Sequence, residues 1–431
     1  MSTSPTFRAL RIHPAWIVAV ATFLTMIGAA GFRSAPGVFM PALHDEFGWD
    51  MGIMSLAVSI NLVLYGLAAP FSAALMERFG IRRIAAIALV LIAAGAILPI
   101  WMTAQWQLLV CWGLLIGLGT GSVSMALVAT ITGRWFVARR GLVTGVLTAA
   151  AATGQLIFLP VMATLLTHHG WRSATLVIGC AALLIVPVVL IFLRDRPADL
   201  AVTAYGETPE HQAFPPAPAS PALAMTTLRD AVRDRTFLLL AATFAICGAS
   251  TNGLVGTHFI PAAMDHGMAE TAAASLLALV GVFDIVGTIF SGWLTDRFDP
   301  RLLLATYYGL RGLSLFALPA LFGDSMHPSM LVFVLFYGLD WVATVPPTMA
   351  LCRSAFGSRA PIVFGWVFAC HQLGAATAAT VAGAIRDDMG TYNLAFYGAG
   401  ALCLLATLGC LSIRKRPPVA EPEPDPLGAA V

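Results

Sequence analysis

Long apolar runs alternate with short polar segments along the whole chain. A hydrocarbon core about 30 Å thick is crossed by about 20 mostly apolar helical residues, and each run reaches that length. Lipid offers the backbone no hydrogen-bond partner, so unbroken runs of this kind are helices. The pattern predicts an all-α polytopic membrane protein with twelve transmembrane helices, at residues 14–43, 51–76, 84–103, 107–133, 141–167, 171–193, 236–264, 271–294, 302–322, 328–352, 361–385 and 392–413.

Composition agrees with this pattern and narrows the function. The 431 residues are 58% hydrophobic and only 11% charged, whereas soluble domains hold about 25% charged residues. The seven cysteines lie in or at the ends of spans without a CxxC pair, which favours apolar filling over a metal site or disulfides. No GxxxxGK phrase followed by serine or threonine is present. We therefore expect no ATP use, no cofactor and no catalysed reaction.

Basic residues indicate the orientation. If the N-terminus is cytoplasmic, twenty of the 24 lysines and arginines lie in cytoplasmic segments, and only Arg172 and Arg386 lie outside. The remaining two, Arg33 and Arg311, lie within spans. Such an excess marks the cytoplasmic side. We expect both termini in the cytoplasm of a bacterial-type cytoplasmic (inner) membrane, and a first span too long to be a cleaved signal.

A polar, proline-rich stretch divides the chain after the sixth span. Its composition predicts a cytoplasmic linker that is flexible in its middle, with a helix expected at 225–235. The acidic, proline-rich C-terminal segment is expected to be disordered. The predicted domains are an N-terminal six-helix bundle at 1–193, a linker at 194–235, a C-terminal six-helix bundle at 236–413 and a cytoplasmic tail at 414–431.

The two bundles repeat one another. VFMPALHD at 38–45 aligns with HFIPAAMD at 258–265, and this alignment defines a constant offset between the halves. The same offset relates three further landmarks: Arg139 and Arg359, Gly145 and Gly365, and Gly154 and Gly374. Two six-span halves in one orientation are typical of secondary transporters, in which the halves rock to open a central site alternately to each side. One chain then holds both halves, so we expect a monomer in the lipid bilayer.

An acid followed by an arginine occurs in each half, in SAALMERFGI at 72–81 and SGWLTDRFDP at 291–300. Both phrases lie in short cytoplasmic turns, where an exposed ion pair contributes only about 0–1 kcal/mol. Such a pair can hold an inside-closed arrangement and release it; the alternative is a basic anchor with incidental acids. The predicted cytoplasmic gate residues are Glu77, Arg78, Arg82, Asp296 and Arg297.

These phrases resemble the loop motif GxLaDrfGrr of the major facilitator superfamily, and the resemblance extends along the whole chain. The first copy has Ala73 for the glycine and Glu77 for the aspartate, and the second has Asp299 for the later glycine. The resemblance implies the twelve-helix transporter fold of that superfamily, with spans one, four, seven and ten around a central cavity.

Within the superfamily, GRWFVARRGLVTGVLTAAAATG at 133–154 resembles the fifth-span signature of monocarboxylate porters and oxalate-formate type carriers. Ala150 stands where a glycine is usual. In the eighth span, Asp284 matches the aspartate of monocarboxylate porters, whereas Thr288 occupies the place of their substrate-binding arginine. The resemblance implies an organic-anion substrate and argues against simple lactate-like recognition.

Few charges or histidines lie inside the spans, and each is a functional candidate because a charge at the bilayer centre costs at least about 2.5–3.5 kcal/mol. Arg33 presents a fork suited to a carboxylate; the alternatives are snorkelling and a structural pair with Asp340. Asp284 and Arg311 each lie about ten residues from the cytoplasmic end of their span, which places both at a similar depth in the membrane. They can therefore meet, as a structural pair or as a proton-coupling site.

Other polar residues complete the predicted substrate site. Pro346 and Pro347 break the helix after Asp340 and Trp341, which indicates a lined pathway. The histidines can titrate near neutral pH, and the amides and the phenol can hydrogen-bond a solute; inter-helix bonding is the alternative for each. The predicted substrate-binding residues are Arg33, Asn61, Tyr65, Gln155, Asn252, His258, Asp340, Trp341 and His371.

The sequence thus predicts a carrier for a small organic anion, a carboxylate, driven by proton coupling or by exchange with a counter-substrate. Efflux of amphipathic compounds is the alternative within transport, and a membrane sensor with the same fold is the alternative outside it. No nucleic-acid partner is expected.

Overall fold

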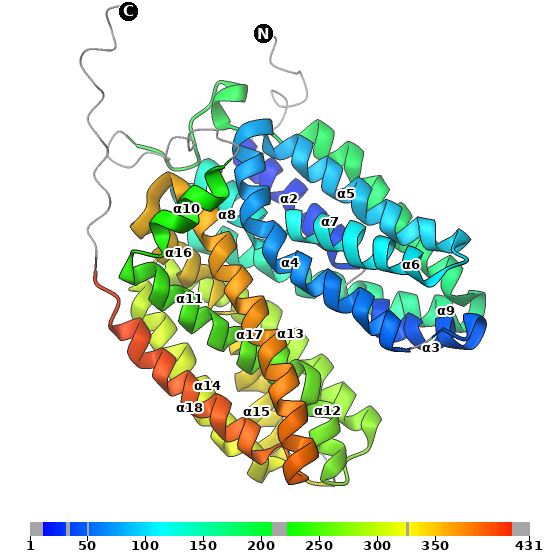
Figure 1. Ribbon diagram of the computed structural model, residues 1–431. Helices are drawn as coiled ribbons and strands as arrows, with labels where there is room; N and C mark the ends of the chain where they lie inside the picture. Colours follow the sequence, from blue (N-terminus) through cyan, green and yellow to red (C-terminus); the bar gives the residue numbers. More distant parts are fainter. Residues whose placement is uncertain (1–11, 32–34, 50, 209–221, 325–326, 416–431) are drawn as a thin grey trace, which may run out of the picture.

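The computed structural model describes residues 12–31, 35–49, 51–208, 222–324 and 327–415. Two helical bundles make up this part of the chain (Figure 1). The helices of the first bundle are α2 (Pro14–Ala30), α3 (Ala35–Phe47), α4 (Met51–Phe79), α5 (Ile81–Ile97), η2 (Leu98–Trp101), α6 (Gln105–Leu108), η3 (Leu109–Ile116), α7 (Gly117–Ser122), α8 (Met125–Trp135) and α9 (Arg140–Phe192). Those of the second are α11 (Arg235–Gly248), η5 (Ala249–Val255), α12 (Gly256–Asp265), α13 (Glu270–Thr295), α14 (Pro300–Leu321), α15 (Pro328–Asp340), α16 (Val345–Phe356), α17 (Ala360–Met389) and α18 (Asn393–Leu411).

Ten helices in the described ranges are long and apolar enough to cross a membrane. One of them, Pro328–Met389, has 62 residues, a length of about three bilayer thicknesses. It therefore contains two spans, and the chain turns at Gly357, whose φ is +54°. The shorter apolar helix Pro14–Ala30 adds the start of the first span. The predicted all-α polytopic fold is confirmed.

Helix α9 also holds two of the predicted spans. Gly170 interrupts it with a φ of +76°, a conformation that costs glycine nothing but strains other residues. The interruption falls between the spans expected at 141–167 and 171–193. A single glycine therefore supplies the turn between the fifth and sixth spans.

Two seams join the bundles, one between α9 and α13 and one between α4 and α17. A Cβ at Gly145 on α9 would lie 2.5 Å from the carbonyl oxygen of Thr288 on α13. A Cβ at Gly365 on α17 would lie 2.7 Å from the backbone of Pro70 on α4. Gly145 and Gly365 are counterparts in the two halves, so the internal repeat places a small residue at each close helix crossing.

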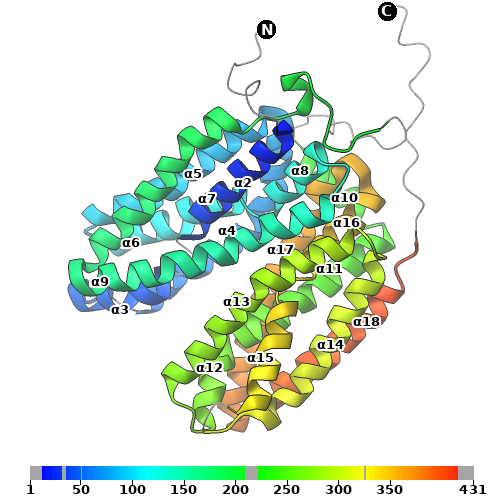
Figure 2. The same ribbon diagram turned by 180° about the vertical axis from the view of Figure 1, so that it is seen from behind.

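The seams lie toward one end of the molecule, which we call the linker end and define by α10 (Leu223–Ala231), the α8–α9 turn and the α16–α17 turn. Away from this end the two bundles diverge, as Figures 1 and 2 show from opposite sides. The described part of the chain is therefore closed at the linker end and spread at the other.

The described parts of the linker pack against the bundles. The backbone of Tyr205 hydrogen-bonds to Trp135, Val137 and Ala138 in the α8–α9 turn. Helix α10 overlaps the stretch where a linker helix was expected, and it touches the second seam: Trp366 on α17 donates to a carbonyl of α10 at 3.0 Å. The linker thus contacts both bundles at their closed end.

Candidate substrate and coupling site

A break between α15 and α16 forms the centre of the candidate site. Helix α15 ends at Asp340, and α16 begins at Val345 with two prolines in its first turn. Proline lacks an N–H and fits only the start of a helix, so Pro346 and Pro347 force the break. The first bundle breaks at the counterpart position, between α7 and α8 at 123–124, which the repeat aligns with 343–344. Such a break leaves carbonyl oxygens available to other groups.

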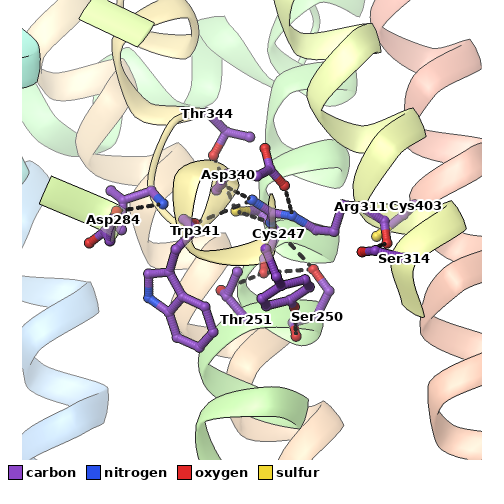
Figure 3. A network of polar contacts seen from close by, with 12 residues as sticks. Cys247, Ser250, Thr251, Asp284, Arg311, Ser314, Asp340, Trp341, Thr344 and Cys403 are labelled. Atoms are coloured by element: carbon purple, nitrogen blue, oxygen red, sulfur yellow. Dashed lines mark hydrogen bonds and ion pairs between the residues drawn. The ribbon is translucent and has the colours of Figure 1, made fainter. Parts of the chain in front are cut away.

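Arg311 on α14 uses these free acceptors. Its side chain is buried, and its Nε donates to Asp340 Oδ2 at 2.6 Å (Figure 3). Its Nη2 donates to the carbonyl of Asp340 at 2.5 Å and to that of Trp341 at 3.2 Å. A planar guanidinium suits this set of acceptors, which an ammonium would only partly fill.

The same guanidinium reaches the seventh span. Its Nη1 donates to the Cys247 sulfur at 3.0 Å and to the Ser250 hydroxyl at 3.4 Å. The Tyr337 hydroxyl donates to the Ser250 carbonyl at 2.7 Å. These contacts lie around the start of η5, a π-helical segment of the kind found often at functional sites. Arg311 therefore connects three spans through one side chain.

Asp284 and Arg311 do not form the ion pair that their similar depth allowed, and their role in proton coupling stays a prediction. Asp284 on α13 is buried and accepts hydrogen bonds from the Thr288 hydroxyl at 2.8 Å and the Val342 N–H at 3.1 Å. Within the described ranges it forms no ion pair, and Arg311 pairs with Asp340 instead. The broken turn lies between the two side chains (Figure 3). The two side chains lie at a similar depth in the membrane, but they point in different directions from their helices.

The other predicted binding residues lie in several parts of the two bundles. Asn61 donates to the Trp112 carbonyl at 2.8 Å, within the first bundle. The ring of Tyr65 packs edge-on against Phe368 in the α4–α17 seam, with 5.2 Å between centroids. Trp341, Asn252 and Gln155 are half-buried.

The two histidines lie in the second bundle. The Nε2 atom of His258 is 2.8 Å from the Ala379 carbonyl, and its ring packs on Tyr392. His371 is buried beside the ring of Phe244, with 4.8 Å between centroids. Arg33 lies outside the described residues.

Neutral residues that the sequence did not distinguish complete the cluster. Cys247 and Thr344 lie 3.2 Å apart across two spans. Hydroxyls and thiols are common in transmembrane helices. Their presence in the sequence therefore indicates a binding site only when a neighbouring charged residue is already known. The proximity of Ser250 and Thr251 to Asn252 in sequence was the one available signal.

The acids of the two repeated phrases make different contacts from one another. Asp296 accepts from the N–H groups of Gly141 at 2.6 Å and Leu142 at 2.9 Å, and so caps α9 across the seam. Glu77 pairs with Arg134 at 2.6 Å within its own bundle. In the part of the chain that the structure describes, neither acid bonds to the arginine that follows it, and the role of these residues as a cytoplasmic gate stays a prediction.

Two of the three predicted gate arginines, Arg297 and Arg78, contact neighbouring residues, whereas Arg82 bonds to a distant segment. Arg297 donates to the Trp293 carbonyl at 3.0 Å and lies over that residue's ring. Arg78 lies over the ring of Phe79, with 5.0 Å to the centroid. The backbone N–H of Arg82 donates to Asp195 at 2.9 Å.

The structure is a polytopic helical fold of two bundles, with a buried charge cluster in the second bundle. The chain belongs to the Major Facilitator Superfamily, whose family model matches residues 18–376 and 257–430. It is therefore a transporter and not an enzyme.

Relatives and solved structures agree with this assignment. The chain is 25% identical over 401 residues to the uncharacterized MFS-type transporter YcxA of Bacillus subtilis, covering 91% of this chain and 92% of the relative. It is 27% identical over 398 residues to monocarboxylate transporter 11 of Homo sapiens, covering 90% and 80%. The fold is similar to the fucose:proton symporter of E. coli, with a TM-score of 0.67 at 15% identity, over 93% of this chain and 98% of that one.

Proposed function

We propose that the chain carries a small organic anion, a carboxylate, by alternating access, together with a proton or in exchange for a counter-substrate. The observation that carries this proposal is the cluster of Asp284, Arg311 and Asp340, which buries two carboxylates with one guanidinium. The similarity of the chain to monocarboxylate transporters supports the choice of substrate class.

The charge balance of the cluster suggests how proton and anion are linked. An uncompensated buried charge is strongly unfavourable, so a second carboxylate beside one cation favours uptake of a proton. Asp340 Oδ1 is buried and has no hydrogen-bond partner in the described part of the chain, so it has room to accept one. Once Asp340 is neutral, Arg311 loses its direct ion-pair partner, and the carboxylate of a substrate can take that place. Binding one proton and one anion then leaves the net charge of the cluster unchanged.

The broken helix supports movement at this point. Four residues between α15 and α16 are outside regular α-helix, so Trp341, next to Asp340, can reorient without melting either helix. We propose Arg33 as a further anion ligand from the first bundle, although it lies outside the described residues. Asn61, Tyr65, Gln155, Asn252, His258, Trp341 and His371 remain proposed lining residues.

The proposed setting is the cytoplasmic membrane of a bacterium, with the linker end and both termini in the cytoplasm and a monomer as the working unit. The excess of arginine in the predicted cytoplasmic segments supports this orientation. The arrangement described above then corresponds to a carrier closed toward the cytoplasm.

Uptake into proteoliposomes tests the proposal. A panel of radiolabelled monocarboxylates and dicarboxylates is offered with and without an inward proton gradient, to wild type and to the Arg33→Ala and Asp340→Asn variants. We expect saturable, gradient-stimulated uptake of one acid by wild type. Arg33→Ala should abolish it, whereas Asp340→Asn should lose the stimulation by the gradient and keep acid-for-acid exchange.

Arg386→Ala is the matched control, because it removes an arginine from an ion pair at the surface. It should transport like wild type. If correctly inserted wild-type protein takes up no acid of the panel, the anion proposal is wrong, and efflux of amphipathic compounds becomes the better explanation.

A further inference from the structure

The two seams at the linker end are counterparts in sequence but differ in their bonding. In the α9–α13 seam, Asp296 accepts two backbone N–H groups from the first turn of α9. In the α4–α17 seam, the counterpart acid is Glu77, and α17 is the counterpart helix. No hydrogen bond joins Glu77 to the first turn of α17 in the described chain, so the second seam lacks the cap that the first one has.

One residue accounts for the loss of one of the two donors. The offset that relates Arg139 to Arg359 places Pro361 at the counterpart of Gly141. Gly141 gives the shorter of the two bonds to Asp296, at 2.6 Å. Proline has no N–H, so α17 cannot make the corresponding bond to an acid from α4. Proline is otherwise well suited to the first turn of a helix, so it keeps α17 intact while removing the donor.

Glu77 shows the consequence of the missing donor. Its Oε1 pairs with Arg134 at 2.6 Å, whereas its buried Oε2 has no hydrogen-bond partner among the described residues. A cavity of about 40 Å³ lies at this point, lined by Glu77 and Arg134 from the first bundle and by Arg353 and Pro361 from the second. That volume has room for about two or three water molecules, which need polar partners such as these.

We propose that Pro361 makes the α4–α17 seam the weaker of the two, so that separation of the bundles at the linker end begins there. Pro361 acts as a positioning residue: it leaves Glu77 bound within its own bundle rather than across the seam. The α9–α13 seam, held by Asp296, separates second. This inference does not depend on the identity of the substrate.

Hydrogen–deuterium exchange of the full-length protein in lipid nanodiscs tests the order of opening. In wild type, peptides covering 72–83 at the end of α4 should exchange faster than peptides covering 137–146 at the start of α9. Pro361→Ala restores a backbone donor at the cavity that Glu77 lines, and a hydrogen bond to a buried carboxylate is worth about a tenfold change in an equilibrium. Exchange of the 72–83 peptides should therefore slow about tenfold, although their own sequence is unchanged.

Two further variants separate this effect from a general change in stability. Pro328→Ala alters a first-turn proline of α15, and should not slow the 72–83 peptides. Adding Glu77→Gln to Pro361→Ala should remove the slowing, because the new donor then lacks a charged acceptor. The proposal is overturned if folded Pro361→Ala exchanges like wild type at 72–83, or if the slowing persists without the Glu77 carboxylate.

Discussion

Replacing Arg311 by methionine removes the cation of the buried cluster and keeps most of the side-chain length. Asp340 then remains buried without its ion-pair partner. In the unchanged protein, Arg311 Nε lies 2.6 Å from Asp340 Oδ2. Removing one member of a buried pair typically costs about 3–5 kcal/mol, because the other charge is left uncompensated. We expect Arg311→Met to lower the free energy of unfolding by about that amount.

The double variant Arg311→Met with Asp340→Asn tests the reason for the loss. It leaves no uncompensated charge at this pair, and the main remaining cost is that the carbonyls of Asp340 and Trp341 lose a donor, at about 1 kcal/mol each. The double variant should therefore be more stable than Arg311→Met alone, by about 1–3 kcal/mol.

Unfolding of the purified protein by SDS in mixed micelles measures these differences, and the exposed pair of Arg386 with Asp265 provides the control. Arg386→Met should have little effect, because exposed ion pairs contribute little. If Arg311→Met costs less than about 1 kcal/mol, or if the double variant loses the sum of the two single losses, the cluster does not hold the buried charges assigned to it.

Three further outcomes follow from the described contacts. Gly145→Ala should destabilise the closed linker end by about 1–3 kcal/mol, because the new methyl group overpacks the α9–α13 seam. Gly133→Ala is the control, since nothing lies within 4 Å of its new Cβ, and its free energy of unfolding should not fall in this way. Unfolding measurements compare the two free energies. Asp296→Ala should speed amide exchange at 137–146, because α9 loses its cap; unchanged exchange argues against the cap. Hydrogen bonds from Arg172 and then Trp171 hold the pKa of Glu46 below its usual 4.5, so this contact stabilises the fold above that pH and is lost as pH falls through the lowered pKa. The melting temperature of Glu46→Gln should therefore depend less on pH in that range than that of wild type.

The fold could be predicted because lipid offers the backbone no hydrogen-bond partners, which restricts the structures that can span it. Long apolar runs must form helices, and the turn at Gly170 falls where the hydropathy pattern already separated two spans. The constant offset between repeated phrases indicated two similar halves before any contact was known. Each of these inferences needs only the order of residues along the chain.

Partners across helices could not be predicted in the same way. Depth placed Asp284 and Arg311 at one level, but the direction of each side chain around its helix depends on packing. The break after Asp340 also offered Arg311 two backbone carbonyls that no residue pattern displays. The same limit applies at the predicted gate, where Asp296 accepts from two backbone N–H groups of α9, which no side-chain pattern reveals.

Thr288 brings the charge cluster and the α9–α13 seam into contact. Its hydroxyl donates to Asp284 at 2.8 Å, and its carbonyl oxygen lies where a Cβ on Gly145 would collide, at 2.5 Å. Asp296, which caps α9, directly follows the last residue of the same helix. On the proposed function, a change of charge in the cluster alters the acceptor strength of Asp284 and with it the bond from the Thr288 hydroxyl, in the helical turn that packs against α9. Chemistry in the cluster can therefore reach the seam through one rigid helix, without a chain of intermediate side chains.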